Sequence, residues 1–303
     1  MKAYYTDHFV LPLPPGHRFP MEKYRLLRDL VACHPDIELI EPAAATNQDL
    51  FRAHDVEYIE AVTQGRLTDA QIREIGFPWS EAMVERSRRS AGATIAACLS
   101  ALKEGVAVNL AGGTHHAYAD KGSGFCVFND AAVAARYVQS MSPTRVAVID
   151  LDVHQGNGTA AILGKDSSCF TLSLHGEKNF PFRKEDSHLD VGLPDGCGDG
   201  EYLKILQQAL MELEQRFTPE LIIYLAGADP HEGDRLGRLK LTMQGMEQRD
   251  RLVLGFAREL QCPIAIAMAG GYGRTIKTTV DVHHQTIQLA LQYHQQIQPK
   301  VHQ

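Results

Sequence analysis

Short apolar runs rich in β-branched residues alternate with longer segments of helical periodicity along most of this sequence. The runs are apolar on both faces, which is typical of strands in a parallel sheet that helices cover on both sides. Seven runs predict strands: Lys2–Thr6, Ile37–Glu41, Val106–Leu110, Arg145–Asp150, Cys169–Leu174, Leu221–Ala226 and Ile264–Ala269. Five longer segments predict helices: Ser80–Lys103, Asn129–Ser140, Gly200–Arg216, Thr242–Glu259 and Ile276–Gln295. We therefore expect one α/β domain over residues 1–303, with a central parallel sheet flanked by helices on both faces.

Charge and cysteine usage exclude several classes of partner. The net charge is −7, and the longest basic cluster, Arg86–Arg89, falls in a helical pattern, so we expect no nucleic-acid partner. The six cysteines are scattered and form no CxxC pair, which favours a reducing compartment. The first residues lack the apolar core of a signal peptide, and no apolar stretch reaches about 18 residues. The expectation is a cytoplasmic protein with no membrane partner.

The stretch VAVIDLDVHQGNG combines a buried strand with three polar side chains. Asp150, Asp152 and His154 are spaced two residues apart, and they project to one side if the extended backbone continues. Two neighbouring carboxylates need a cation or shared protons. Oxygen and imidazole ligands on one side of a chain suit a divalent metal. The alternative is a strand end whose polar residues cap the next helix.

Other predicted strands are also followed by polar or aromatic residues. His115 and His116 follow Val106–Leu110, Asp229 follows Leu221–Ala226, and Tyr272 follows Ile264–Ala269. In parallel sheets, ligands bind beyond the carboxyl ends of the strands. Several such strand ends favour a polar active site over a set of solvated loops.

Five segments, in this order, resemble the motif set of the histone deacetylase family: GGTHHA, GFCVFND, DLDVHQGNGT, GADPHEGDRLG and GGYG. The resemblance runs from about His17 to about Tyr272. GFPWSEAMVERSRRSAGAT and NFPFRKEDSHLDVGLPDG are most similar to the class IV branch and its bacterial relatives. The resemblance implies the arginase/deacetylase fold.

The resemblance also implies a metal site with an open coordination position. Asp152, His154 and Asp229 match the family's zinc ligands, and the oxygen-rich set would also accept iron(II). A potassium site is implied by Ser173 with groups around Asp150, Asp152, His154 and Leu174.

Five residues match the family's catalytic groups. His116 matches the general base and acid, and His115 matches the histidine that supplies charge and orientation. Asp150 matches the carboxylate partner of His115, and Asn157 matches the partner of His116, where other branches have Asp. Tyr272 matches the tyrosine that stabilises the oxyanion.

A narrow substrate channel is implied as well. Phe125 and Phe180 match its aromatic walls, Leu236 lies at its mouth, and Gly124 belongs to the same channel. His231 departs from the family pattern, so we expect a further polar group facing the pocket. In the short segment Gly65–Trp79 there is no counterpart of the rim aspartate of class I members.

The activity implied by this resemblance is removal of acetyl or longer acyl groups from lysine side chains of a protein or peptide. The alternative is hydrolysis of a small acylated amine such as an acetylpolyamine. A third interpretation is an inactive acyl-lysine reader, which the presence of Tyr272 and both tandem histidines disfavours. An arginase-like site with two manganese ions is disfavoured because Gln155 and Asn157 stand where further ligands would help.

Overall fold

Eight parallel strands form one continuous sheet in the computed structural model, which describes residues 1–297. Their order across the sheet is β2-β1-β3-β8-β7-β4-β5-β6. At the centre, Val146 of β4 pairs with Leu221 of β7 and with Cys169 of β5. The strands are β1 Lys2–Tyr4, β2 Glu38–Ile40, β3 Val106–Asn109, β4 Val146–Asp150, β5 Cys169–Gly176, β6 Leu189–Leu193, β7 Leu221–Leu225 and β8 Ile264–Ala267. The predicted fold class, a single α/β domain with a parallel sheet, is confirmed.

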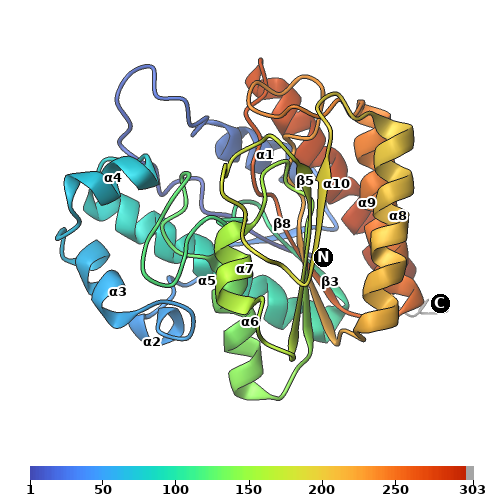
Figure 1. Cartoon of the computed structure of the whole chain (residues 1–303), viewed down its shortest axis with the longest axis horizontal. Helices are drawn as coiled ribbons and strands as arrows, with labels where there is room; N and C mark the ends of the chain where they lie inside the picture. Colours follow the sequence, from blue (N-terminus) through green and yellow to red (C-terminus); the bar gives the residue numbers. More distant parts are fainter. Residues whose placement is uncertain (298–303) are drawn as a thin grey trace.

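Helices cover both faces of this sheet. Figure 1 shows α8, α9 and α10 together on one side and α5, α6 and α7 on the other. Helix α1 packs against α10. The helices are α1 Lys23–Val31, α2 Asn47–Leu50, α3 Val56–Thr63, α4 Asp69–Ile75, α5 Glu81–Glu104, α6 Asp130–Met141, α7 Asn157–Leu163, α8 Asp199–Arg216, α9 Met243–Glu259 and α10 Ile276–Ile297. Within residues 1–297, no helix is long and apolar enough to cross a membrane.

Two separate cores explain why the strand sequences are apolar on both faces. Ile222 and Tyr224 of β7 pack into a cluster with residues of α8, α9 and α10. The alternate residue Ile223 packs into a second cluster with residues of α5 and α6. Because neither side of β7 meets water, an alternating pattern is absent and the strand reads as a continuous apolar run.

The sequence did not predict every element. Strand β6 lies at the sheet edge with four of its five residues partly or fully exposed, so it lacks a continuous apolar run. Helices α1, α2, α3, α4 and α7 are short, at nine residues or fewer. Two of them, α2 and α4, begin with capping boxes at Thr46 and Thr68, and this motif is the local sequence signal for their first turns. Residues 298–303 of the predicted domain lie outside the described residues.

A buried carboxylate ties α6 to the turn that follows β3. Oδ2 of Asp130 accepts the Gly113 N–H at 3.0 Å, and Oδ1 accepts the Thr114 N–H at 2.7 Å. Gly113 has a φ of +70°, and a Cβ there would lie 2.3 Å from the Cβ of Ala269. The turn that precedes His115 is therefore fixed from both sides.

We predict that Asp130→Asn destabilises the protein by about 2 kcal/mol or more, because an amide cannot replace both acceptors of a charged, buried group. Urea denaturation measures this change. Asp69→Asn, in the exposed first turn of α4, is the matched control and should cost a few tenths of a kcal/mol. Equal stability of the two variants would contradict the prediction.

Candidate active site

Four neighbouring strands end at one edge of the sheet and deliver the predicted site residues there. In sheet order these are β3, β8, β7 and β4. A cavity of about 960 Å³ opens at this edge. Ten predicted site residues line it: His115, His116, Gly124, Phe125, Asp152, His154, Asn157, Phe180, Leu236 and Tyr272. The structure thus brings together residues that are up to 157 positions apart in the sequence (Tyr272 less His115).

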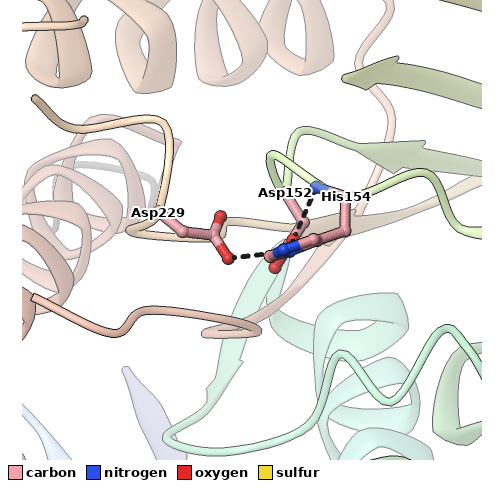
Figure 2. A group of neighbouring side chains, drawn as sticks. All are labelled: Asp152, His154 and Asp229. Carbon is pink, nitrogen blue, oxygen red and sulfur yellow. Dashed lines mark hydrogen bonds and ion pairs between the residues drawn. The ribbon is translucent and has the colours of Figure 1, made fainter. Parts of the chain in front are cut away.

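Asp152, His154 and Asp229 form a buried group that could hold a metal ion. One ligand atom from each lies within 4.8 Å of the others. Figure 2 shows the three side chains pointing toward one another, with Asp229 coming from a separate loop. Nδ1 of His154 is 2.9 Å from Oδ1 of Asp152 and 3.3 Å from Oδ2 of Asp229. Asp152, His154 and Asp229 would hold a divalent cation in place of the proton that this nitrogen shares with the two carboxylates.

The surroundings of this group fit a cation. Oδ2 of Asp229 is buried and, apart from its 3.3 Å ion pair with His154, accepts no hydrogen bond from the described residues. Burial, together with the charge of Asp152, raises the pKa of Asp229 to about 7, and a divalent ion would oppose this shift by favouring the charged carboxylate. A Cβ on Gly270 would lie 2.3 Å from that oxygen and 2.4 Å from Oδ2 of Asp152, so this position leaves no space for a side chain.

Asp150 does not belong to the metal-ligand group. Strand β4 ends at Asp150, so the extended backbone expected through His154 is not present. Oδ2 of Asp150 instead lies 2.6 Å from Nδ1 of His115, and its Oδ1 accepts the Asp152 N–H at 3.1 Å. The condition for all three side chains to project together, an extended backbone through His154, is therefore not met, and Asp150 is the partner of His115 as the resemblance implied.

The tandem histidines have different partners and therefore different charges. Burial lowers the pKa of His115, but Asp150 and Asp152 outweigh this effect and raise the pKa to about 9. Nδ1 of His116 lies 2.6 Å from Oδ1 of Asn157, a neutral group. Burial, and then the charge of His115, lowers the pKa of His116 well below its usual value. A cationic and a neutral imidazole thus stand with their ring centroids 4.1 Å apart.

Asn157 is held in turn by a residue that sequence reasoning missed. Its Nδ2 donates to the Tyr118 hydroxyl at 2.8 Å, and that hydroxyl donates to Oε1 of Glu185 at 3.2 Å. Because Nδ2 is a donor, Oδ1 of Asn157 is the atom that faces His116, so Nδ1 of His116 carries the proton. Its Nε2 is then the basic nitrogen.

Tyr272 stands across the cavity floor from His116. Its ring centroid is 6.5 Å from that of His154 and 6.1 Å from that of Phe125. Its backbone N–H donates to Oδ2 of Asp234 at 2.6 Å, which fixes the loop after β8. Burial, and then the charges of Asp152 and Asp229, raises the pKa of its phenol well above the usual value. The hydroxyl therefore stays a hydrogen-bond donor.

Aromatic and small residues narrow the approach to this floor. The ring of Phe180 packs edge-on against the His116 ring, with the two ring centroids 4.9 Å apart. A Cβ on Gly124 would lie 2.7 Å from Cδ2 of His116 and 3.1 Å from Cε1 of Phe180, at a φ of +53°. The ring centroid of Phe125 lies 5.5 Å from that of Phe19, which belongs to the segment before α1. The sequence did not indicate this contact.

Two other expectations about the site have different outcomes. His231 is not among the residues that line the cavity; its Nδ1 accepts the Gly233 N–H at 2.9 Å within its own turn. Ser173, within β5, is the register partner of Asp150, and its hydroxyl forms a hydrogen bond with Nδ1 of His175 at 3.0 Å. The potassium site there stays a prediction.

Two buried cations near the site carried no sequence signal. Lys23 of α1 is 2% exposed, and its Nζ lies 5.8 Å from the Tyr272 ring centroid and donates to the Ala269 carbonyl at 3.2 Å. Arg249 of α9 is fully buried, and its Nη1 donates to the carbonyls of Gly227 at 2.6 Å and Leu151 at 3.4 Å. Both carbonyls lie within two residues of a candidate metal ligand.

A set of hydrogen bonds holds Arg249 in place. Its Nε donates to Oδ1 of Asp250 at 2.9 Å, and Asp250 also accepts the hydroxyls of Tyr224 and Thr286, each at 2.6 Å. The guanidinium therefore links α9 to both loops that carry the aspartate ligands. We therefore expect it to position the metal-ligand group.

We predict that Arg249→Met lowers the free energy of unfolding by about 3 kcal/mol, because Asp250 is left as an unpaired buried charge. The variant should also lose its metal at lower chelator concentration, since both ligand loops lose an anchor. Arg251→Met is the matched control on the same helix, where the side chain is 54% exposed, and it should change neither quantity. If Arg249→Met does not fold, Arg249→Lys gives the same comparison. Unchanged metal retention would leave Arg249 with a stabilising role alone.

Comparisons with known proteins agree with this fold. Residues 17–287 match the histone deacetylase domain family. The chain is 43% identical over 284 residues to an uncharacterized protein of Picosynechococcus sp., covering 92% of this chain and 94% of that protein. It is 35% identical over 247 residues to histone deacetylase 2 of Arabidopsis thaliana, covering 77% of this chain and 63% of the plant protein.

A solved structure gives the same assignment. The crystal structure of an HDAC homolog from Aquifex aeolicus matches with a TM-score of 0.82 at 26% identity, covering 95% of this chain and 83% of that one. The fold and the buried polar site define a hydrolase. The chain belongs to the histone deacetylase family and has the arginase/deacetylase fold, as the sequence motifs predicted.

Proposed function

We propose that this protein is a metal-dependent deacylase that hydrolyses the amide bond between an acyl group and a lysine side chain. The observation that carries the proposal is the grouping of a three-residue metal-ligand set, His116 and Tyr272 at the floor of one cavity. The ring centroid of His154 is 5.9 Å from that of His116 and 6.5 Å from that of Tyr272. One amide group bound at the metal-ligand set would therefore be within reach of both.

The donor set supports one catalytic divalent ion held by Asp152, His154 and Asp229. Zinc is the proposed ion, and iron(II) suits the same oxygen-rich set. When bound, the ion supplies a Lewis acid and a water of lowered pKa. Gln155 donates to Asp190 and to the Glu185 carbonyl, and Asn157 contacts His116 and Tyr118, so neither is free to hold a second ion.

His116 is proposed to move the proton in the reaction. Its Nδ1 carries a proton toward Asn157, and its Nε2 makes no hydrogen bond to the described residues. That nitrogen would take the proton of the attacking water and then deliver it to the leaving lysine amine. His115, kept cationic by Asp150, would supply positive charge beside the carbonyl oxygen as it becomes negative.

Tyr272 is proposed as the second source of oxyanion stabilisation, through its phenolic proton. Phe125, Phe180, Leu236 and Gly124 would hold the acyl-lysine stem in the narrow approach. A potassium ion near Asp150 and Ser173 would offset the carboxylate charge. Assignment to the class IV branch rests on the two segments that resemble it and also stays a prediction.

We predict that the purified wild-type protein hydrolyses acyl-lysine peptides and that Tyr272→Phe lowers turnover by about 100-fold or more, the scale for one lost oxyanion donor. Fold and affinity for a metal-chelating hydroxamate should be near normal, because the hydroxyl acts mainly in the transition state. Steady-state kinetics and inhibitor titration measure the two effects. Tyr293→Phe, on α10, is the control. Wild-type protein that binds acyl-lysine without hydrolysing it would instead be a reader.

Metal removal provides an independent test of the ligand set. We predict one equivalent of divalent ion per chain, loss of activity on chelation and recovery on adding zinc. Zinc at a thousandfold excess over its Kd should stabilise the wild type by about 4 kcal/mol, because it binds only the folded state. Asp229→Ala should show no such stabilisation in calorimetry, whereas Asp195→Ala, on the surface, should keep it. Full activity in metal-free protein would contradict the proposal.

A further inference from the structure

The mouth of the cavity has the opposite charge to the molecule as a whole. Apart from the buried Lys23, the histidines and the metal ligand Asp152, the charged residues that line the cavity are six basic side chains and two acidic ones, Glu74 and Glu185. The whole chain carries a net charge of −7. The six are Arg18, Arg73, Lys121, Lys178, Arg183 and Arg238. A local excess of positive charge at the entrance of a site affects which molecules reach it.

Two of the six are already neutralised by the protein. Lys121 forms an ion pair with Glu74 at 2.8 Å, and Arg238 forms one with Asp195 at 3.0 Å. The Glu185 carboxylate accepts the hydroxyl of Tyr118 and has no cationic partner among residues 1–297. These contacts reduce the free positive charge at the mouth but do not remove it.

The other four are exposed and, within the described residues 1–297, make no ion pair or side-chain hydrogen bond. They are Arg18, Arg73, Lys178 and Arg183, which we call the rim cations. Arg18 precedes α1, Arg73 lies in α4, and the other two lie in the loop between β5 and β6. Three separate segments therefore present unpaired positive charge to one opening.

An exposed aromatic side chain stands beside these charges. Phe182 is 89% exposed, lines the cavity, and lies between Lys178 and Arg183 in the same loop. Its ring centroid is 6.5 Å from that of Phe180. A small polyamine would leave this surface uncovered, whereas a peptide that enters the channel with one side chain would lie across it.

We infer that the preferred substrate is an acyl-lysine in a peptide segment with acidic flanking residues. The inference rests on the proposed deacylase function and names its substrate class. Aspartate and glutamate on either side of the acyl-lysine would meet the rim cations while the acyl chain enters the cavity. A basic segment or a cationic polyamine would instead meet like charge at the opening.

Three acetyl-lysine peptides of equal length, with acidic, uncharged or basic flanks, test this inference on the wild-type protein. The kcat/KM should fall in that order, with roughly a tenfold or greater difference between the first and the last. The preference should shrink at about 1 M salt, where the Debye length is about 3 Å. An acetylpolyamine should be hydrolysed less efficiently than the acidic peptide.

Charge reversal at the rim then assigns the effect to these residues. Arg73→Glu and Arg183→Glu should each raise KM for the acidic peptide by up to about fivefold, the upper range for an exposed ion pair, with kcat unchanged. Both should improve hydrolysis of the basic peptide and leave a blocked acetyl-lysine without flanks unaffected. Lys165→Glu is the control. Lys165 is exposed and lies four residues before β5 begins, so it is at the amino end of that strand, away from the cavity at the carboxyl ends.

The outcomes separate this inference from the function beneath it. Equal hydrolysis of all three peptides, or better hydrolysis of the acetylpolyamine, would overturn the substrate class and leave the deacylase function standing. No hydrolysis of any acylated substrate would overturn the proposed function and the inference with it.

Discussion

Two carboxylates, those of Asp152 and Asp229, face one imidazole at the buried floor of the cavity. Like charges at this distance in a buried setting are tolerated only with a cation or a proton between them. Much of the surrounding structure serves to hold the three groups there. The Gly270 N–H donates to Asp152 at 2.8 Å, and the Val153 N–H donates to Asp229 at 2.9 Å. Arg249 holds both ligand loops by donating hydrogen bonds to the carbonyl groups of Leu151 and Gly227.

The same electrostatic constraint separates the roles of the tandem histidines. Asp150 lies at the end of β4. One of its carboxylate oxygens contacts Nδ1 of His115, and the other accepts the Asp152 N–H. Its charge makes His115 a cation, and that cation in turn disfavours a proton on His116. A neutral amide beside His116 then sets the ring orientation without adding charge. Adjacent identical residues thus acquire opposite protonation states from what stands on either side of them.

Predictions from the sequence succeeded where the signal was local. The seven predicted strands and five predicted helices are present, each with ends within two residues of the observed bounds. The sequence correctly predicted that His115, His116, Asp229 and Tyr272 lie at one end of the sheet. Each follows a predicted strand, and the carboxyl ends of parallel strands meet at that end. Lys23 and Arg249 were missed because a charged residue in a helical pattern reads as solvent-exposed. Only the packing of α1 against α10, and of α9 against α8 and α10, makes them buried.

The loop between β5 and β6 contributes residues to three different parts of the site. It contributes Phe180 to the approach, Lys178 and Arg183 to the opening, and Glu185 to the hydroxyl that steadies Asn157. A loop exchange with a relative would therefore replace the selectivity elements and the outermost support of the base together. In this chain, a change to this loop that alters substrate choice also alters the reaction rate. Divergence toward new substrates through this loop requires compensation at Tyr118, or a new partner for its hydroxyl, before the rate recovers.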